Sequence, residues 1–109
     1  MQKTLETHSA SEFTNPFFVM VHTKNAYSDR HMRKKGSFVR TLANIETYKR
    51  NYDHITIDDL TSPDTIPPNL PKNRPILVCG FFKDICVKDQ RDALVKAGYD
   101  AYISREGSY

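Results

Sequence analysis

The sequence predicts a small α/β domain in which a mostly parallel sheet is flanked by helices. Short apolar or alternating runs suited to strands recur along the chain, at residues 17–22, 54–58, 76–79 and 99–104. Helical patterns at residues 38–50 and 84–97 separate successive strands. Because alternating strands and helices are typical of a parallel sheet covered on its faces, we expect one α/β layer over residues 17–109.

Turn and cap residues define the elements further. Ser37 is a candidate N-cap, and apolar residues at helical spacing after it predict the helix 38–50. Five prolines between residues 60 and 75 exclude an ordinary helix or a central strand there, so we expect an extended connection. Asp84 is a candidate cap for the next helix, which Gly98 ends.

The remaining N-terminal segment is polar. Residues 1–16 are rich in Ser and Thr and end at Asn15-Pro16. We expect a flexible arm outside the domain.

Composition argues against a disulfide-rich protein and against a membrane-spanning one. The chain has 109 residues, which suits one domain, and a formal net charge of +3, which favours acidic partners only weakly. Its two cysteines cannot form a disulfide framework, and no apolar run approaches the roughly 20 residues that a membrane span needs. We expect a cytoplasmic protein with reduced thiols and no membrane contact.

The corner from Gly80 to Cys86 is the candidate site. Ligands of parallel sheets lie at the carboxyl ends of strands, where loops lead into helix N-termini. In the first helical turn, unpaired amides and the helix dipole would favour a Cys86 thiolate and an oxyanion formed after its attack on a carbonyl. From composition alone, the alternative of a buried core cysteine is favoured.

The sequence around Cys86, over residues 78–99, favours the interpretation of Cys86 as a nucleophile. Val-Cys-Gly-Phe-Phe-Lys-Asp-Ile-Cys-Val at residues 78–87, followed by Lys-Ala-Gly-Tyr at 96–99, resembles the isochorismatase-like cysteine hydrolases, which include nicotinamidases. The resemblance covers about a third of the chain and implies a reduced, Rossmann-like form of that fold. It implies that Cys86 is the nucleophile and that the backbone amides of Lys83 and Cys86 form the oxyanion site.

The resemblance is incomplete at the other catalytic positions. If residues 17–22 are the first strand of the family, His22 stands where the catalytic Asp is expected and would be a substitute base, with His31 as a second candidate. Asp58 stands where the family has its Lys. The family domain is also longer than this chain, so a shortened form would take covering elements from a second copy, and we expect a homo-oligomer.

A metal site is suggested only by a fragment of a second motif. Asp29-Arg30-His31, followed by Ser37-Phe38, resembles the metal-binding segment of nicotinamidases, but Lys35 replaces the second His. A cation would oppose a divalent metal, so we prefer a basic solvated loop and expect no cofactor, with Asp29 and His31 as the only metal candidates.

Two functions therefore remain open. The first is a cysteine hydrolase that acts on an amide or related bond of a small molecule through Cys86. The alternative is a catalytically inactive relative that serves as a binding or assembly module. Nucleic-acid binding is disfavoured because no aromatic or groove-fitting element adjoins the basic cluster of Arg30, Arg33, Lys34 and Lys35.

Overall fold

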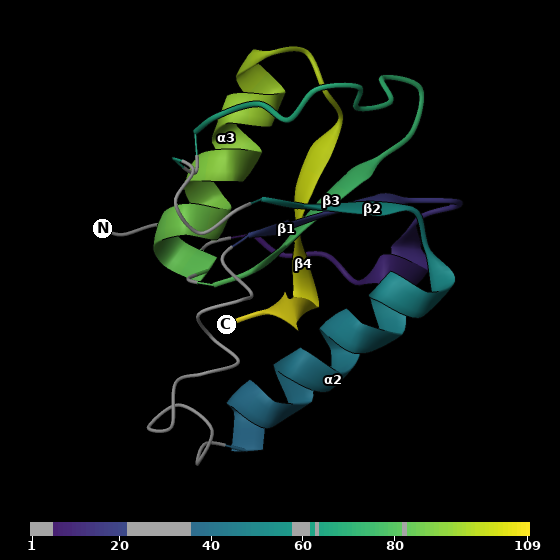
Figure 1. The fold of residues 1–109 in the computed structure, drawn as a ribbon, viewed down its shortest axis with the longest axis vertical. Coiled ribbons are helices and arrows are strands. Elements are labelled where there is room, and N and C mark those ends of the chain that lie inside the picture. Colours follow the sequence, from purple (N-terminus) through teal and green to yellow (C-terminus); the bar gives the residue numbers. More distant parts are fainter. Residues whose placement is uncertain (1–5, 22–35, 58–61, 63, 82) are drawn as a thin grey trace.

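A computed structural model describes residues 6–21, 36–57, 62, 64–81 and 83–109. Within these residues, one four-stranded sheet has the order β2-β1-β3-β4, and every neighbouring pair is parallel (Figure 1). The strands are β1 (Phe17–Val21), β2 (His54–Ile57), β3 (Ile76–Gly80) and β4 (Ala101–Ser108). The predicted fold class, a small parallel sheet flanked by helices, is confirmed.

The two long helices cover opposite faces of this sheet. Residues of α2 (Gly36–Asn51), among them Phe38 and Ile45, share a buried cluster with Phe18 of β1. Leu94 of α3 (Lys88–Lys96) belongs to the other cluster, together with Val19. Successive residues of a strand point to opposite faces, so a strand covered on both sides reads as a continuous apolar run. This is why the central strands were recognisable in the sequence.

A glycine ends β3 where it meets β1. Gly80 has a φ of +121°, and a Cβ there would lie 2.0 Å from the Val21 carbonyl oxygen. The next amide, that of Phe81, donates to the same oxygen at 2.9 Å. Gly80 therefore lets the carboxyl ends of β1 and β3 approach closely before the chain turns into the following helix.

That helix starts differently from the prediction. The helical segment begins at Lys83 with a π-helical turn, η3 (Lys83–Val87), and continues as α3. The segment thus begins one residue before Asp84, which was predicted as its cap. Cys86 still lies in the first helical turn, as expected.

The last strand is longer than the predicted 99–104. It continues to Ser108 after a register shift opposite β3, between Val78 and Gly80. The Ser104 hydroxyl accepts the Gly107 amide at 3.0 Å, and a Cβ on Gly107 would lie 2.9 Å from that of Cys79. The polar sequence from Arg105 hides this continuation, because the irregular ladder breaks the alternation that predicts a strand.

The proline-rich connection contains no helix or strand over residues 62 and 64–75, in agreement with the prediction. It is tied to α3 by the Gln90 side-chain amide, which donates to the Thr65 carbonyl oxygen at 2.9 Å. Within the described parts of the chain, none of the helices is both long and apolar enough for a membrane span.

The described part of the N-terminal segment lies beside β4. The His8 amide donates to Ile103, and the Arg105 amide donates to His8, both at 2.8 Å. A short 3-10 helix, η1 (Ala10–Glu12), follows before β1. A flexible arm over residues 1–16 stays a prediction, and these two hydrogen bonds are among those that its movement would break.

Candidate functional site

A cleft of about 730 Å³ opens at the carboxyl end of the sheet. Its walls come from the first half of α2, the start of η3 and the end of β4, which approach one another near the C-terminus in Figure 1. It is lined by Ser37, Arg40, Thr41, Asn44, Lys83, Ile85, Arg105, Glu106, Ser108 and Tyr109. This is the edge at which parallel sheets commonly bind ligands.

The charge of the cleft is predominantly positive. Arg40, Lys83 and Arg105 come from three different elements, and Glu106 is the one residue with an acidic side chain in the lining. Arg40 and Lys83 form no ion pair with any residue that the structure describes. The first turn of α2 contains no acidic residue that would offset the positive end of the helix dipole. The cleft is therefore suited to an anion.

Backbone hydrogen bonds join Tyr109, which follows β4, to the residues around the start of η3. The Tyr109 amide donates to the Gly80 carbonyl at 3.0 Å, and the Lys83 amide donates to the Tyr109 carbonyl at 2.9 Å. The Lys83 amide, predicted as an oxyanion donor, is thus engaged by Tyr109. Lys83 is nevertheless one of the residues that line the cleft.

An apolar wall lies beside the cations. Ile85 is 62% exposed, which is unusual for an isoleucine. Tyr109 also lines the cleft, and its ring makes an edge contact with that of Phe38 at a centroid distance of 5.5 Å. A ligand that joins an anionic group to an apolar body would contact both kinds of surface.

Cys86 belongs to different surroundings. Its side chain is half-buried and packs against the core cluster on the α3 side of the sheet. It is not one of the residues that line the cleft, although Lys83 and Ile85 on either side of it in sequence are. Cys86 therefore packs against the core and does not line this cleft, and its role as a nucleophile stays a prediction.

The other predicted site residues cannot be placed. His22, Asp29 and His31 lie outside the described residues, as do Asp58 and the basic cluster that includes Arg30. Among the described residues, no three His, Cys, Asp or Glu side chains are grouped so that they could hold a metal ion.

Cys79 and Tyr48 are ionisable residues that are buried in the core. Burial raises the pKa of the Cys79 thiol far above its ordinary value, so Cys79 stays protonated and unreactive at neutral pH. Burial also raises the pKa of Tyr48 to about 12, although a hydrogen bond with Ser104 acts in the opposite direction. Both groups pack on the α2 side of the sheet as neutral parts of the core.

Sequence reasoning missed Arg40 and Arg105. Arg40 had a detectable signal, because it lies one turn into a helix that follows a predicted strand. Arg105 had another, since the expected end of the last strand at Ser104 would place it just beyond a carboxyl end. Asn44 had none: its amide donates to the Glu106 carbonyl at 2.9 Å, a contact across 62 residues.

No protein-family model, curated protein or solved structure matches this chain.

Proposed function

We propose that this protein binds a small molecule that carries an oxyanion, either a carboxylate or a phosphate, next to an apolar group. The observation that carries the proposal is the convergence of Arg40, Lys83 and Arg105 on one cleft. Such a protein corresponds to the binding-module alternative derived from the sequence, within an isochorismatase-like fold.

The chemistry of the lining residues supports this ligand class. A guanidinium presents a planar fork that matches two oxygens of a carboxylate or phosphate, and a lysine adds a compact positive charge. Ile85 and Tyr109 offer an apolar surface beside these donors. The volume of about 730 Å³ lies within the range of small-molecule sites, about 300–1,000 Å³.

Calorimetric titration at low salt tests the proposal with three probes of similar apolar size. Phenyl phosphate and benzoate should bind, and neutral benzyl alcohol should not. Arg40→Ala and Lys83→Ala should each weaken phenyl phosphate binding about tenfold, which corresponds to one charge-assisted hydrogen bond.

Arg50→Ala is the matched control, because Arg50 is an exposed arginine near the other end of α2 and does not line the cleft. It should leave the affinity unchanged. Equal affinity for benzyl alcohol and phenyl phosphate would contradict the proposal, as would an Arg50→Ala variant that binds as weakly as Arg40→Ala.

The second candidate function is the cysteine hydrolase predicted by resemblance. It is favoured by the place of Cys86 in the first helical turn after β3 and by its incomplete burial. In this mechanism the Cys86 thiolate attacks a small amide, the amine leaves with a proton, and water hydrolyses the thioester to regenerate the thiol. His22 would accept the thiol proton, and the Lys83 amide would have to exchange Tyr109 for the oxyanion.

Hydrolysis of nicotinamide and of simple aryl amides tests this candidate. Catalysis of this kind requires turnover that Cys86→Ser abolishes and that Cys79→Ser leaves intact, together with faster alkylation of Cys86 than of Cys79. Wild-type protein without turnover, or turnover that survives Cys86→Ser, would exclude it.

We also propose that the chain is cytoplasmic and forms a homo-oligomer. β2 is an edge strand of the described sheet, and pairing of edge strands is one route to self-association. Sedimentation equilibrium should give a multiple of the 12.6 kDa chain mass, and a monomer at all concentrations would contradict self-association.

A further inference from the structure

We infer that Thr7 positions Arg105 for the oxyanion, so that the N-terminal segment forms part of the binding site. This inference depends on the proposed function, because it concerns the same cleft. We use the name N-terminal latch for residues 6–12.

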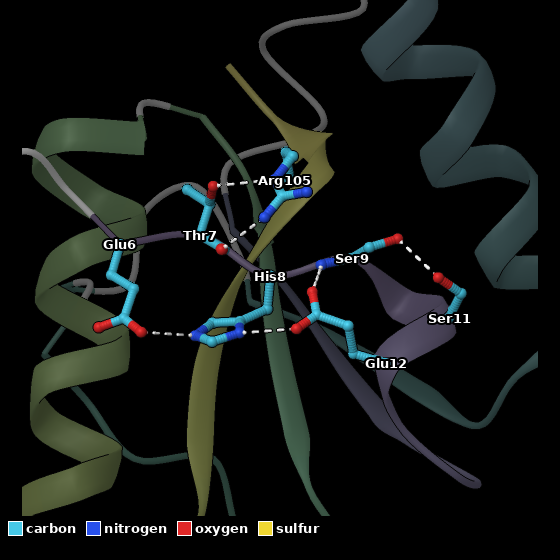
Figure 2. Close-up of polar contacts among 7 residues, drawn as sticks. All are labelled: Glu6, Thr7, His8, Ser9, Ser11, Glu12 and Arg105. Carbon is cyan, nitrogen blue, oxygen red and sulfur yellow. Dashed lines mark hydrogen bonds and ion pairs between the residues drawn. The ribbon is translucent and has the colours of Figure 1, made fainter.

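The latch holds Arg105 at both its backbone and its side chain. The Arg105 guanidinium donates from Nη2 to the Thr7 carbonyl at 3.1 Å and from Nε to the Thr7 hydroxyl at 3.4 Å (Figure 2). The Arg105 amide donates to the His8 carbonyl at 2.8 Å. Arg105 also lines the cleft, so one residue joins the latch to the candidate ligand site.

Both acceptors on Thr7 are uncharged. They orient the guanidinium without neutralising it, whereas a carboxylate partner would offset its charge. An arginine has five N–H donors, and the two bonds to Thr7 leave three. Arg105 therefore retains its charge and the donors that bidentate recognition of an oxyanion requires.

Glu12 is the nearby carboxylate that could have competed for Arg105. Its two oxygens are directed elsewhere: one accepts the Ser9 amide at 2.5 Å, and the other lies 3.3 Å from His8 Nδ1. The Ser9 amide is the largest cause of the lowered Glu12 pKa, followed by His8, and Arg105 makes a smaller contribution. Glu12 thus bonds to two residues of the latch, His8 and Ser9, instead of pairing with Arg105.

His8 anchors the latch to the sheet. Its ring lies between the carboxylates of Glu6 and Glu12, with Nε2 3.2 Å from Glu6 (Figure 2). The ring also makes an edge contact with Tyr102 of β4 at a centroid distance of 5.0 Å. Its backbone amide bonds to Ile103, so displacement of His8 would also displace Thr7.

The test is a double-mutant cycle with phenyl phosphate as the probe. His8→Pro removes the amide that bonds to Ile103, and it should weaken binding about fivefold, as expected for one mispositioned charged donor. Arg105→Ala should weaken binding at least as much. In the Arg105→Ala background, His8→Pro should have no further effect, because the group that the latch positions is already absent.

A second variant and a spectroscopic signal separate positioning from general destabilisation. Thr7→Val removes the hydroxyl acceptor alone and should weaken binding about twofold without altering the fold. The Arg105 Nε–H resonance should exchange slowly in the wild type and faster in His8→Pro. Ser11→Ala, an exposed change in the same segment, is the control and should alter neither measurement.

The outcomes distinguish the two proposals. If the wild type does not bind phenyl phosphate, the proposed function fails. If it binds, but His8→Pro and Arg105→Ala act additively, or if Thr7→Val changes neither affinity nor the Nε–H signal, the inference about the latch is overturned and the proposed function stands.

Discussion

At the scale of single residues, two glycines separate the contribution of backbone conformation to stability from the contribution of close packing. Gly80 and Gly98 both have a positive φ, +121° and +95°. A Cβ on Gly98 would meet no atom within 4 Å, whereas one on Gly80 would meet the Val21 carbonyl oxygen at 2.0 Å. Gly98 therefore isolates the cost of the conformation, and Gly80 adds a clash with backbone that cannot move independently.

We expect Gly98→Ala to lower the free energy of unfolding by about 1 kcal/mol, the usual cost of a positive φ. Gly80→Ala should lower it by about 3 kcal/mol or more, because the strand ends must also separate. Urea denaturation of both variants measures the difference. Equal losses would show that the close approach of β1 and β3 does not constrain position 80.

Tyr48 predicts a specific alkaline pH dependence. Its pKa is raised from 10.0 to about 12 in the folded protein, chiefly by burial, so the folded state binds its proton more tightly than the unfolded state. The resulting stabilisation is complete below pH 10 and is lost as the pH rises through 12.

The free energy of unfolding of wild type and Tyr48→Phe should therefore diverge across this range, with the wild type losing stability more steeply. A constant difference between the two proteins would contradict the raised pKa.

Sequence information was sufficient for some residues and not for others. The corner at Gly80 and the helix end at Gly98 have local signals, and both were predicted. The hydrogen bond from the Lys83 amide to the Tyr109 carbonyl had no local signal, because the two residues are 26 positions apart in the sequence. The local motif that predicted the Lys83 amide as an oxyanion donor carries no information about the Tyr109 carbonyl, which competes for that amide.

At the scale of elements, hydrophobic periodicity predicted the helices and central strands but not their irregular ends. The π-helical start of α3 and the continuation of β4 beyond Ser104 both depend on contacts with other elements. The residue types at the start of α3 and at the end of β4 do not by themselves predict these irregular ends. One of these irregular ends supplies Arg105, which sequence reasoning missed, whereas the other missed residue, Arg40, lies in the regular helix α2.

The amino ends of the strands are joined by Arg74. Its Nε donates to the Asn15 carbonyl at 2.9 Å, and its Nη1 pairs with Asp53 at 3.0 Å. Its Nη2 bonds to the Pro16 carbonyl at 3.2 Å, while the guanidinium lies over the Phe17 ring at 5.6 Å. One planar group thus connects the entries of β1, β2 and β3.

Arg74→Ala should lower the free energy of unfolding by about 2–3 kcal/mol, because several charge-assisted bonds are lost together. Arg74→Lys should recover less than half of this, since an ammonium cannot reproduce the fork. The control is Arg91→Ala, which removes a surface pair with the exposed Asp92 and should cost under about 1 kcal/mol. A loss for Arg74→Ala no larger than that control would contradict the role of Arg74.

At the scale of the whole molecule, strand order brings the site together. β1 and β3 are central although a helix, β2 and the proline-rich connection separate them in sequence, and β4 completes the edge beside the cleft. Alternating strands and helices predicted the class of fold, but they do not determine which carboxyl ends become neighbours. Arg40 and Arg105 are 65 positions apart, and their convergence is a property of this arrangement.

We propose that the ligand of this protein binds in the positive cleft at the carboxyl edge of the sheet rather than beside Cys86. The most direct test is the titration of isotope-labelled protein with phenyl phosphate, followed through backbone amide chemical shifts. We expect saturable shifts at Ser37, Thr41 and Glu106, with smaller shifts at Val87 and Leu94 on the α3 side of the sheet. Shifts confined to the residues around Cys86 and Leu94, or no saturable shift at the cleft, would contradict the claim.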